Sequence, residues 1–165
     1  MELYLIRHGE ARPLAGSDVQ DDAERPLTDT GHAQAQGLAA ALQRHGVHLD
    51  QVVSSPLLRA RQTAEGLMQN WKTPLPELLL CDALAPDTAR SRKVTKFLLK
   101  LTAKSLALVG HMPDLADYAE WLIGSKKAQI AIAKGGVARI DCEGEVPDKG
   151  TGTLTWLITP EWCKA

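Results

Sequence analysis

Four side chains that carry, or can carry, positive charge lie where anion chemistry is possible: Arg7, His8, Arg59 and His111. Each follows a short, mostly apolar run that is typical of a strand buried on both faces. These runs are Leu3–Ile6, Gln51–Ser54 and Leu106–Val109. Because ligands of open α/β sheets bind beyond the carboxyl ends of the strands, we expect the four side chains to meet at one edge of a sheet.

Two guanidinium groups and two imidazoles together suit a phosphoryl group. The planar guanidinium forks match the charged phosphoryl oxygens. An imidazole can attack phosphorus in line when one ring nitrogen is free and the other donates to a fixed acceptor. The second imidazole can stabilise charge on the oxygens. Helix N-termini expected near Ser55 and Pro113 would direct backbone N–H groups to the same place.

Each residue taken alone has a structural explanation. Arg59 by itself would be a solvent-exposed helix arginine, as we expect for Arg61. His111 alone would cap or bridge a loop, and the tripeptide Arg7-His8-Gly9 occurs often by chance. Only the shared placement at strand ends favours a functional site over these alternatives.

Periodicity and helix-boundary residues predict the elements that position the site. Thr28 is a candidate N-cap for a helix that runs to about Arg44 and ends at Gly46. Pro56 suits the first position of a second helix. The remaining elements are helices around Val94–Leu101 and Leu115–Leu122, and strands at Leu78–Leu80, Val137–Asp141 and Thr153–Ile158. This alternation predicts an α/β fold: a three-layer α/β/α sandwich with a mostly parallel central sheet, an antiparallel edge and one domain over residues 1–165.

Composition narrows the classes of function. A formal net charge of -1 gives no sign of a nucleic-acid or membrane partner, so anion binding must depend on a few local cations. Cys81, Cys142 and Cys163 have no metal or redox spacing and are expected to be reduced and packed. No apolar stretch is long enough for a signal peptide or a membrane span, which predicts a cytoplasmic location. His32, His45 and His48 lack partners at ligand spacing, so we expect no metal.

Several segments resemble the histidine phosphatase (phosphoglycerate mutase-like) superfamily. They occur in the family's order from Leu3 to about Leu115: Leu5-Ile6-Arg7-His8-Gly9-Glu10, Pro26-Leu27-Thr28 with Gly31 and Gln34-Ala35, Ser54 to Ala60 with Thr63, and Gly110-His111. The resemblance implies a phosphoglycerate mutase-like fold and a metal-independent phosphatase without a cofactor. His8 would be the phosphorylated nucleophile, and Arg7, Arg59 and His111 would complete the phosphate pocket. The short chain and the segments Arg25-Pro26-Leu27-Thr28 and His111-Met112-Pro113 look most like the phosphohistidine phosphatase SixA branch.

One part of the family pattern is absent. Mutase-like members usually carry a glutamate after the third strand as general acid, but residues 80–87 here contain no glutamate. The aspartates that remain as substitutes are more readily explained as solvated or capping acids: Asp18, Asp21, Asp22, Asp82 and Asp87. An alkoxide leaving group usually needs a positioned acid, whereas an imidazole, with a pKa of roughly 6.5, leaves far more easily. The absence of the glutamate therefore favours a phosphohistidine or other phosphoramidate substrate.

The leading hypothesis is a phosphohistidine phosphatase whose partner is a phosphorylated histidine-phosphotransfer domain or phosphocarrier protein, with phosphate or a similar oxyanion in the pocket. A small-molecule phosphomonoesterase or mutase of the same superfamily is an alternative. A non-catalytic phosphohistidine-binding adaptor is another, although the presence of all the pocket residues argues against it. The sequence leaves open the identity of the phosphoprotein, the pathway and the oligomeric state.

Overall fold

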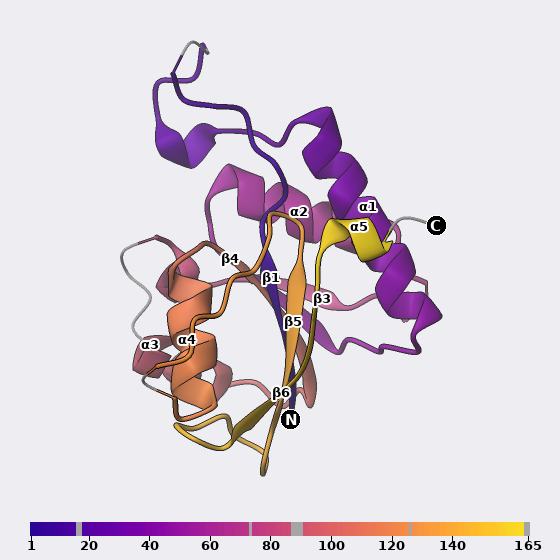
Figure 1. The fold of residues 1–165 in the computed structure, drawn as a ribbon. Coiled ribbons are helices and arrows are strands. Elements are labelled where there is room, and N and C mark those ends of the chain that lie inside the picture. The colour runs from indigo at the N-terminus through magenta and orange to yellow at the C-terminus, as the bar shows by residue number, and fades with distance from the viewer. Residues whose placement is uncertain (16–17, 73, 87–90, 126, 164–165) are drawn as a thin grey trace.

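A mixed six-stranded sheet with the order β3-β2-β4-β1-β5-β6 forms the centre of the protein. The computed structural model describes residues 1–15, 18–72, 74–86, 91–125 and 127–163 (Figure 1). The strands are β1 (Glu2–Arg7), β2 (Gln51–Ser54), β3 (Glu77–Leu80), β4 (Ser105–Gly110), β5 (Val137–Cys142) and β6 (Gly152–Ile158). The pairs β1–β4, β2–β4 and β2–β3 are parallel, whereas β5 runs antiparallel to β1 and β6. The predicted parallel sheet with an antiparallel edge is confirmed.

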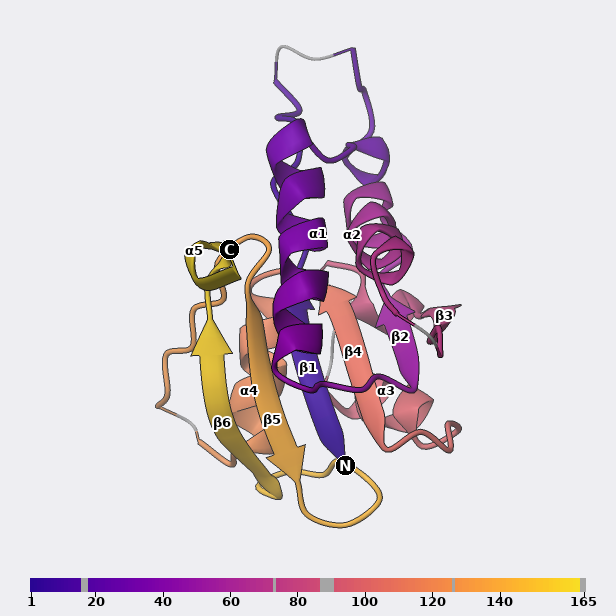
Figure 2. The ribbon, with the colours of Figure 1, turned by 90° about the vertical axis from the view of Figure 1, so that its right-hand side faces the viewer.

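Helices cover both faces of this sheet. Figure 2 shows α1 and α2 in front of it, with α3 and α4 behind. The helices are α1 (Asp29–Arg44), α2 (Leu58–Gln69), α3 (Ser91–Leu98), α4 (Asp114–Leu122) and the short α5 (Pro160–Cys163), and there are 3-10 turns η1 (Asp22–Glu24) and η2 (Asp82–Leu84). This arrangement is the three-layer sandwich that the sequence predicts.

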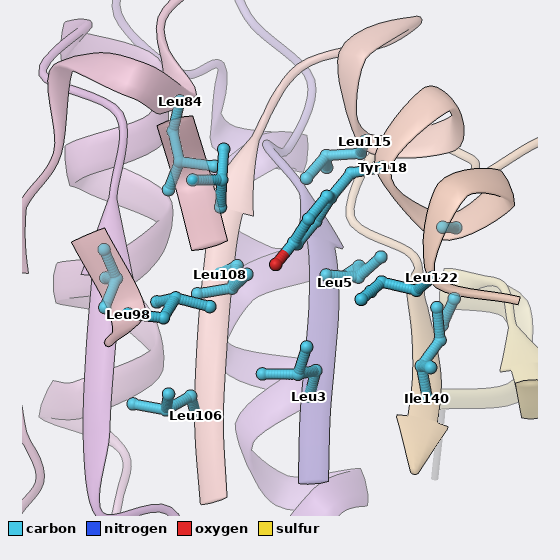
Figure 3. Close-up of a cluster of buried hydrophobic side chains, with 14 of the residues drawn as sticks. Leu3, Leu5, Leu84, Leu98, Leu106, Leu108, Leu115, Tyr118, Leu122 and Ile140 are labelled. Carbon is cyan, nitrogen blue, oxygen red and sulfur yellow. The ribbon is translucent and has the colours of Figure 1, made fainter. Parts of the chain in front are cut away.

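Alternate residues of the central strands enter opposite cores. Leu3, Leu5, Leu106 and Leu108 belong to the core on the side of α3 and α4, where the hydroxyl group of Tyr118 lies between Leu5 and Leu108 (Figure 3). The residues that alternate with these leucines along the strands face α1 and α2: Tyr4, Ile6, Ala107 and Val109. Because both faces of β1 and β4 are buried, these strands have continuous apolar sequences instead of alternating ones.

Helix boundaries follow local hydrogen bonds, and one differs from the prediction. Thr28 caps α1 as expected, since its Oγ1 accepts from the backbone N–H of Gly31 at 3.1 Å. Pro56, however, does not begin α2. Leu57 is extended (φ -65°, ψ 138°), and its N–H donates to Ser55 Oγ at 3.3 Å, so the helix starts only at Leu58. This short turn keeps Ser55 outside the helix.

The packing expected of the cysteines is confirmed, but the exposure expected of Arg61 is wrong: this side chain is half-buried, and its buried Nε has no hydrogen-bond partner among the described residues. Cys81, Cys142 and Cys163 are free thiols and buried. His32, His45 and His48 are exposed. Across the described ranges, we find no helix that is both long and apolar enough to cross a membrane.

Candidate active site

His8 lies immediately beyond the carboxyl end of β1. Its backbone N–H donates to Gly110 O of β4 at 3.0 Å, and the residue is only 8% exposed. Its Nδ1 lies 2.7 Å from the backbone oxygen of Gly9. Since a carbonyl oxygen only accepts hydrogen bonds, Nδ1 carries the ring proton, and Nε2 of the neutral imidazole keeps its lone pair.

Close backbone packing fixes the segment that follows His8. A Cβ on Gly9 would lie 2.7 Å from the backbone oxygen of Gly31 in α1, and a Cβ on Gly31 would overlap the backbone of Glu10. The N–H of Gly9 also donates to Thr63 Oγ1 of α2 at 3.0 Å. The first turn of α1 and the middle of α2 therefore hold the carbonyl that orients His8.

His111 lies beyond the end of β4 and faces His8. The two ring centroids are 5.0 Å apart. His111 Nε2 forms a hydrogen bond of 2.9 Å with Ser55 Oγ, and the residue is 3% exposed. Its Nδ1 is buried and has no hydrogen-bond partner in the part of the chain that the structure describes. Ser55 therefore orients the second imidazole from the end of β2.

Arg59 lies at the second position of α2 and is 4% exposed. Its Nη1 donates to the backbone oxygen of Asp22 at 2.7 Å, and its Nη2 forms an ion pair of 3.0 Å with Asp22 Oδ2. Asp22 also pairs with Arg25 at 2.7 Å. The loop that carries η1 thus contacts the arginine, and Asp22 is not merely a solvated acid.

Arg7, the last residue of β1, donates from Nη1 to the backbone oxygen of Ile132 at 3.0 Å. The charges of Arg59 and Arg7 both reach His8. Burial, reinforced by these two guanidinium groups, lowers the pKa of His8 to about 4, against a smaller opposing effect of the Gly9 hydrogen bond. Burial, followed by the neighbouring His8 and then Arg59, lowers the pKa of His111 to about 3. Both imidazoles are therefore neutral at neutral pH in the free protein.

The structure thus brings together the residues that the sequence places at strand ends. His8 and His111 are neighbours, and the charges of Arg7 and Arg59 act on the same ring. Sequence reasoning missed the partners Ser55 and Asp22. Ser55 lies within the segment Ser54 to Ala60, which resembles the family, but Asp22 contacts a residue 37 positions away, and no local pattern indicates such a contact.

The candidate general acids have other roles or positions. Asp18, Asp21 and Asp82 are exposed, and Asp21 Oδ1 caps η1 by accepting from Ala23 N at 2.9 Å. Burial would raise the pKa of Asp22, but the charge and hydrogen bonds of Arg59, with help from Arg25, hold it below its ordinary value. Asp22 is therefore suited to ion pairing and not to proton donation. Asp87 lies outside the described residues.

No cluster of three or more His, Cys, Asp or Glu side chains that could hold a metal ion occurs among the residues that the structure describes.

Comparison with known proteins agrees with this geometry. The model of the histidine phosphatase superfamily (branch 1) matches residues 3–79. An uncharacterized protein of Picosynechococcus sp. is 36% identical and covers 98% of both chains. Phosphohistidine phosphatase SixA of Escherichia coli is 27% identical over 97% of this chain and 94% of its own.

A solved structure gives the same result for the fold. The structure of the protein histidine phosphatase SixA complexed with tungstate aligns with a TM-score of 0.84 at 25% identity, over 99% of this chain and 100% of that one. With sequence, fold and paired histidines in agreement, the chain belongs to the histidine phosphatase superfamily.

Proposed function

We propose that this protein removes phosphate from phosphohistidine on another protein, through a covalent phospho-His8 intermediate. The observation that carries the proposal is the 2.7 Å contact between His8 Nδ1 and the backbone oxygen of Gly9, which leaves Nε2 free to attack. Membership of a superfamily of phosphatases and mutases supports phosphoryl chemistry.

In the first step, Nε2 of His8 attacks phosphorus, and the P–N bond of the substrate phosphohistidine breaks. The bonding electrons stay on the leaving imidazole, which takes a proton from solvent. Phosphorylation makes the ring of His8 cationic, and the Gly9 carbonyl stabilises this charge through the Nδ1 proton. Water then attacks the phosphorus of phospho-His8, and the bond between Nε2 and phosphorus breaks. The released proton goes to the phosphate or to solvent, inorganic phosphate leaves, and Nε2 recovers its lone pair.

Three buried nitrogen atoms are available to bind the phosphoryl oxygens. The Nε atoms of Arg7 and Arg59 and the Nδ1 atom of His111 have no hydrogen-bond partner among the described residues. An unsatisfied buried donor costs about 1–3 kcal/mol, so bound phosphoryl oxygens that accept from these atoms would recover that cost. The negative charge would also raise the lowered pKa of His111 and favour its protonated, donating form.

We further propose that this catalysis needs no metal ion or cofactor, since Arg7, Arg59 and His111 supply the positive charge. The similar SixA structure is a complex with tungstate, which supports an oxyanion-binding site in this protein. None of the described candidate acids is a ready proton donor. Arg59 and Arg25 hold Asp22 as a carboxylate, and Asp18, Asp21 and Asp82 are exposed. A site of this kind favours an imidazole leaving group, as in a phosphorylated phosphotransfer domain or phosphocarrier protein.

Phosphate release from a histidine-phosphorylated phosphotransfer domain and a histidine-phosphorylated phosphocarrier protein tests the proposal. His8→Ala should lower the rate by about 10³-fold or more, because the covalent route is lost. His32→Ala, which removes an exposed histidine of α1, is the matched control and should keep the wild-type rate. Wild-type activity should also survive a chelator.

Two results would contradict the proposal. A strong dependence on added metal would exclude the mechanism, and a large preference for an alkyl phosphate over phosphoramidate would mean that the substrate is a small phosphomonoester.

A further inference from the structure

Helix α3 has sharply different faces. Val94 and Leu98 are buried in the core against the sheet. Lys93 and Lys96 of the helix and Lys100, just after it, are exposed. Their spacing of three and four residues places these lysines along one side, because such residues are neighbours on a helix surface.

The lysines border a hollow of about 300 Å³ between α3 and the end of β3. Its apolar part includes Leu80, which is 49% exposed, and the partly buried Phe97. We call these five residues the β3–α3 surface: Leu80, Lys93, Lys96, Phe97 and Lys100. A large exposed leucine beside charged groups resembles the apolar centre and polar rim of a protein interface.

Positive charge dominates the β3–α3 surface. Asp82 is the acidic side chain among the described residues that line the hollow. The ion pairs formed within the described ranges do not include Lys93, Lys96 or Lys100. This local excess contrasts with the formal net charge of -1 for the whole chain. An acidic face of a partner would therefore be complementary in charge to this surface.

This surface adjoins the active site through two hydrogen bonds. The N–H of Cys81, which also lines the hollow, donates to Ser54 O at 2.9 Å. The next residue, Ser55, contacts His111 at 2.9 Å. The end of β3 that borders the hollow is therefore paired with the end of β2, and the residue after β2 holds His111.

We propose that the β3–α3 surface binds an acidic, partly apolar face of the protein that carries the phosphohistidine. This inference rests on the proposed function and adds a docking surface to it. The apolar part formed by Leu80 and Phe97 favours a protein over a nucleic acid, whose binding depends mainly on cations that contact phosphates.

The double variant Lys93→Glu/Lys96→Glu tests the proposal against Lys127→Glu/Lys149→Glu, a charge-matched control in two other exposed segments. The substrates are a histidine-phosphorylated phosphotransfer domain, a histidine-phosphorylated phosphocarrier protein and free phosphoramidate. For the phosphoprotein that the wild type uses, we expect kcat/KM to fall about 10-fold or more in the α3 variant only. For phosphoramidate, all three proteins should agree within about twofold, because the catalytic groups are unchanged.

Lys93→Arg/Lys96→Arg, which keeps the charge, should retain wild-type activity, and added salt should lower the wild-type kcat/KM toward that of the glutamate variant. If the wild type released no phosphate from either phosphoprotein, both the proposed function and the docking surface would be overturned. Normal wild-type release with no difference between the two glutamate variants would overturn the docking surface alone. An equal loss on phosphoramidate, or an effect seen only on binding to a DNA oligonucleotide, would also overturn it.

Discussion

At the scale of single residues, the two buried imidazoles couple folding to protons. Burial is the main reason that the pKa values of His8 and His111 lie below 6.5, at about 4 and about 3. In the unfolded chain, both rings regain the ordinary pKa of roughly 6.5. Between these values the unfolded state binds more protons than the folded state, so acid favours unfolding.

We expect the free energy of unfolding to be highest above about pH 6.5 and to fall as the pH decreases toward the pKa values of the folded state. Each histidine contributes at most about 1.4 kcal/mol per pH unit, so the loss between about pH 7 and about pH 5 should be roughly 2–4 kcal/mol. Urea denaturation at a series of pH values measures it. The double variant His8→Gln/His111→Gln should lose most of this dependence, whereas His32→Gln should keep it. A flat wild-type profile would contradict the expectation.

Asp22 shares the guanidinium of Arg59 with any bound phosphate. Its side chain is 50% exposed, so the pair contributes little to stability, but its negative charge lies beside the anion site. Asp22→Asn can keep the backbone contact to Arg59 Nη1 while removing the charge. We therefore expect the variant to bind inorganic phosphate about fivefold more tightly, a difference of about 1 kcal/mol.

Product inhibition by inorganic phosphate measures this effect. Asp21→Asn is the matched control, since Asp21 caps η1 and is exposed. Weaker phosphate binding in Asp22→Asn would mean that the carboxylate acts mainly by positioning Arg59.

The sequence predicts where some of these site residues lie, but not all of them. His8, Arg59 and His111 could be placed together because each follows a predicted strand, and parallel strands end at a common edge. The contacts of Asp22 with Arg59 and of Ser55 with His111 depend on how a loop and a turn fold in three dimensions. Such contacts have no periodic pattern, so they were not predicted.

At the scale of elements, the approach of α1 to the segment after β1 holds the nucleophile in place. Gly31 has no room for a side chain because the backbone of Glu10 occupies that space. A methyl group there would push apart α1 and the segment that includes Gly9, whose carbonyl orients His8. The position of the helix and the reactivity of the imidazole are therefore linked.

Gly31→Ala should destabilise the protein by about 1–3 kcal/mol through overpacking and should also lower the rate of phosphate release. Gly37 in the same helix is the matched control, since the nearest atom that its added Cβ would meet among the described residues is the backbone oxygen of Cys163, at 3.7 Å. Gly37→Ala should stabilise by up to about 1 kcal/mol through helix propensity and leave the rate unchanged. Urea denaturation and phosphate-release assays compare the two variants. Equal effects at both positions would contradict the role assigned to Gly31.

Element boundaries could be predicted where a side chain decides them. Thr28 and Gly46 mark the two ends of α1 as expected, by a side-chain cap and by a left-handed φ of 71°. Pro56 was misleading because the Ser55 turn competes with the helix for the N–H of Leu57. The short α5 was not predicted, since four residues are too few to show helical periodicity.

At the scale of the whole molecule, one sheet joins two separate cores. Leu108 packs toward α3 and α4, whereas Leu38 of α1 packs on the opposite face. Trp121 and Trp156 belong to these two cores, respectively. Because β1 and β4 contribute side chains to both, loss of either core exposes the strands that support the other.

We therefore expect residues 1–165 to unfold as a single cooperative unit. Leu108→Ala and Leu38→Ala remove fully buried side chains from opposite faces, and each should cost about 2–5 kcal/mol. The test uses single-tryptophan proteins that keep only Trp121 or only Trp156 and follows their fluorescence in urea. In each leucine variant, both reporters should shift to the same lower midpoint, because the two cores share one sheet. If Leu108→Ala moved only the Trp121 transition and Leu38→Ala only the Trp156 transition, the two layers would unfold independently. The active site would then not depend on cooperative unfolding of the whole sheet.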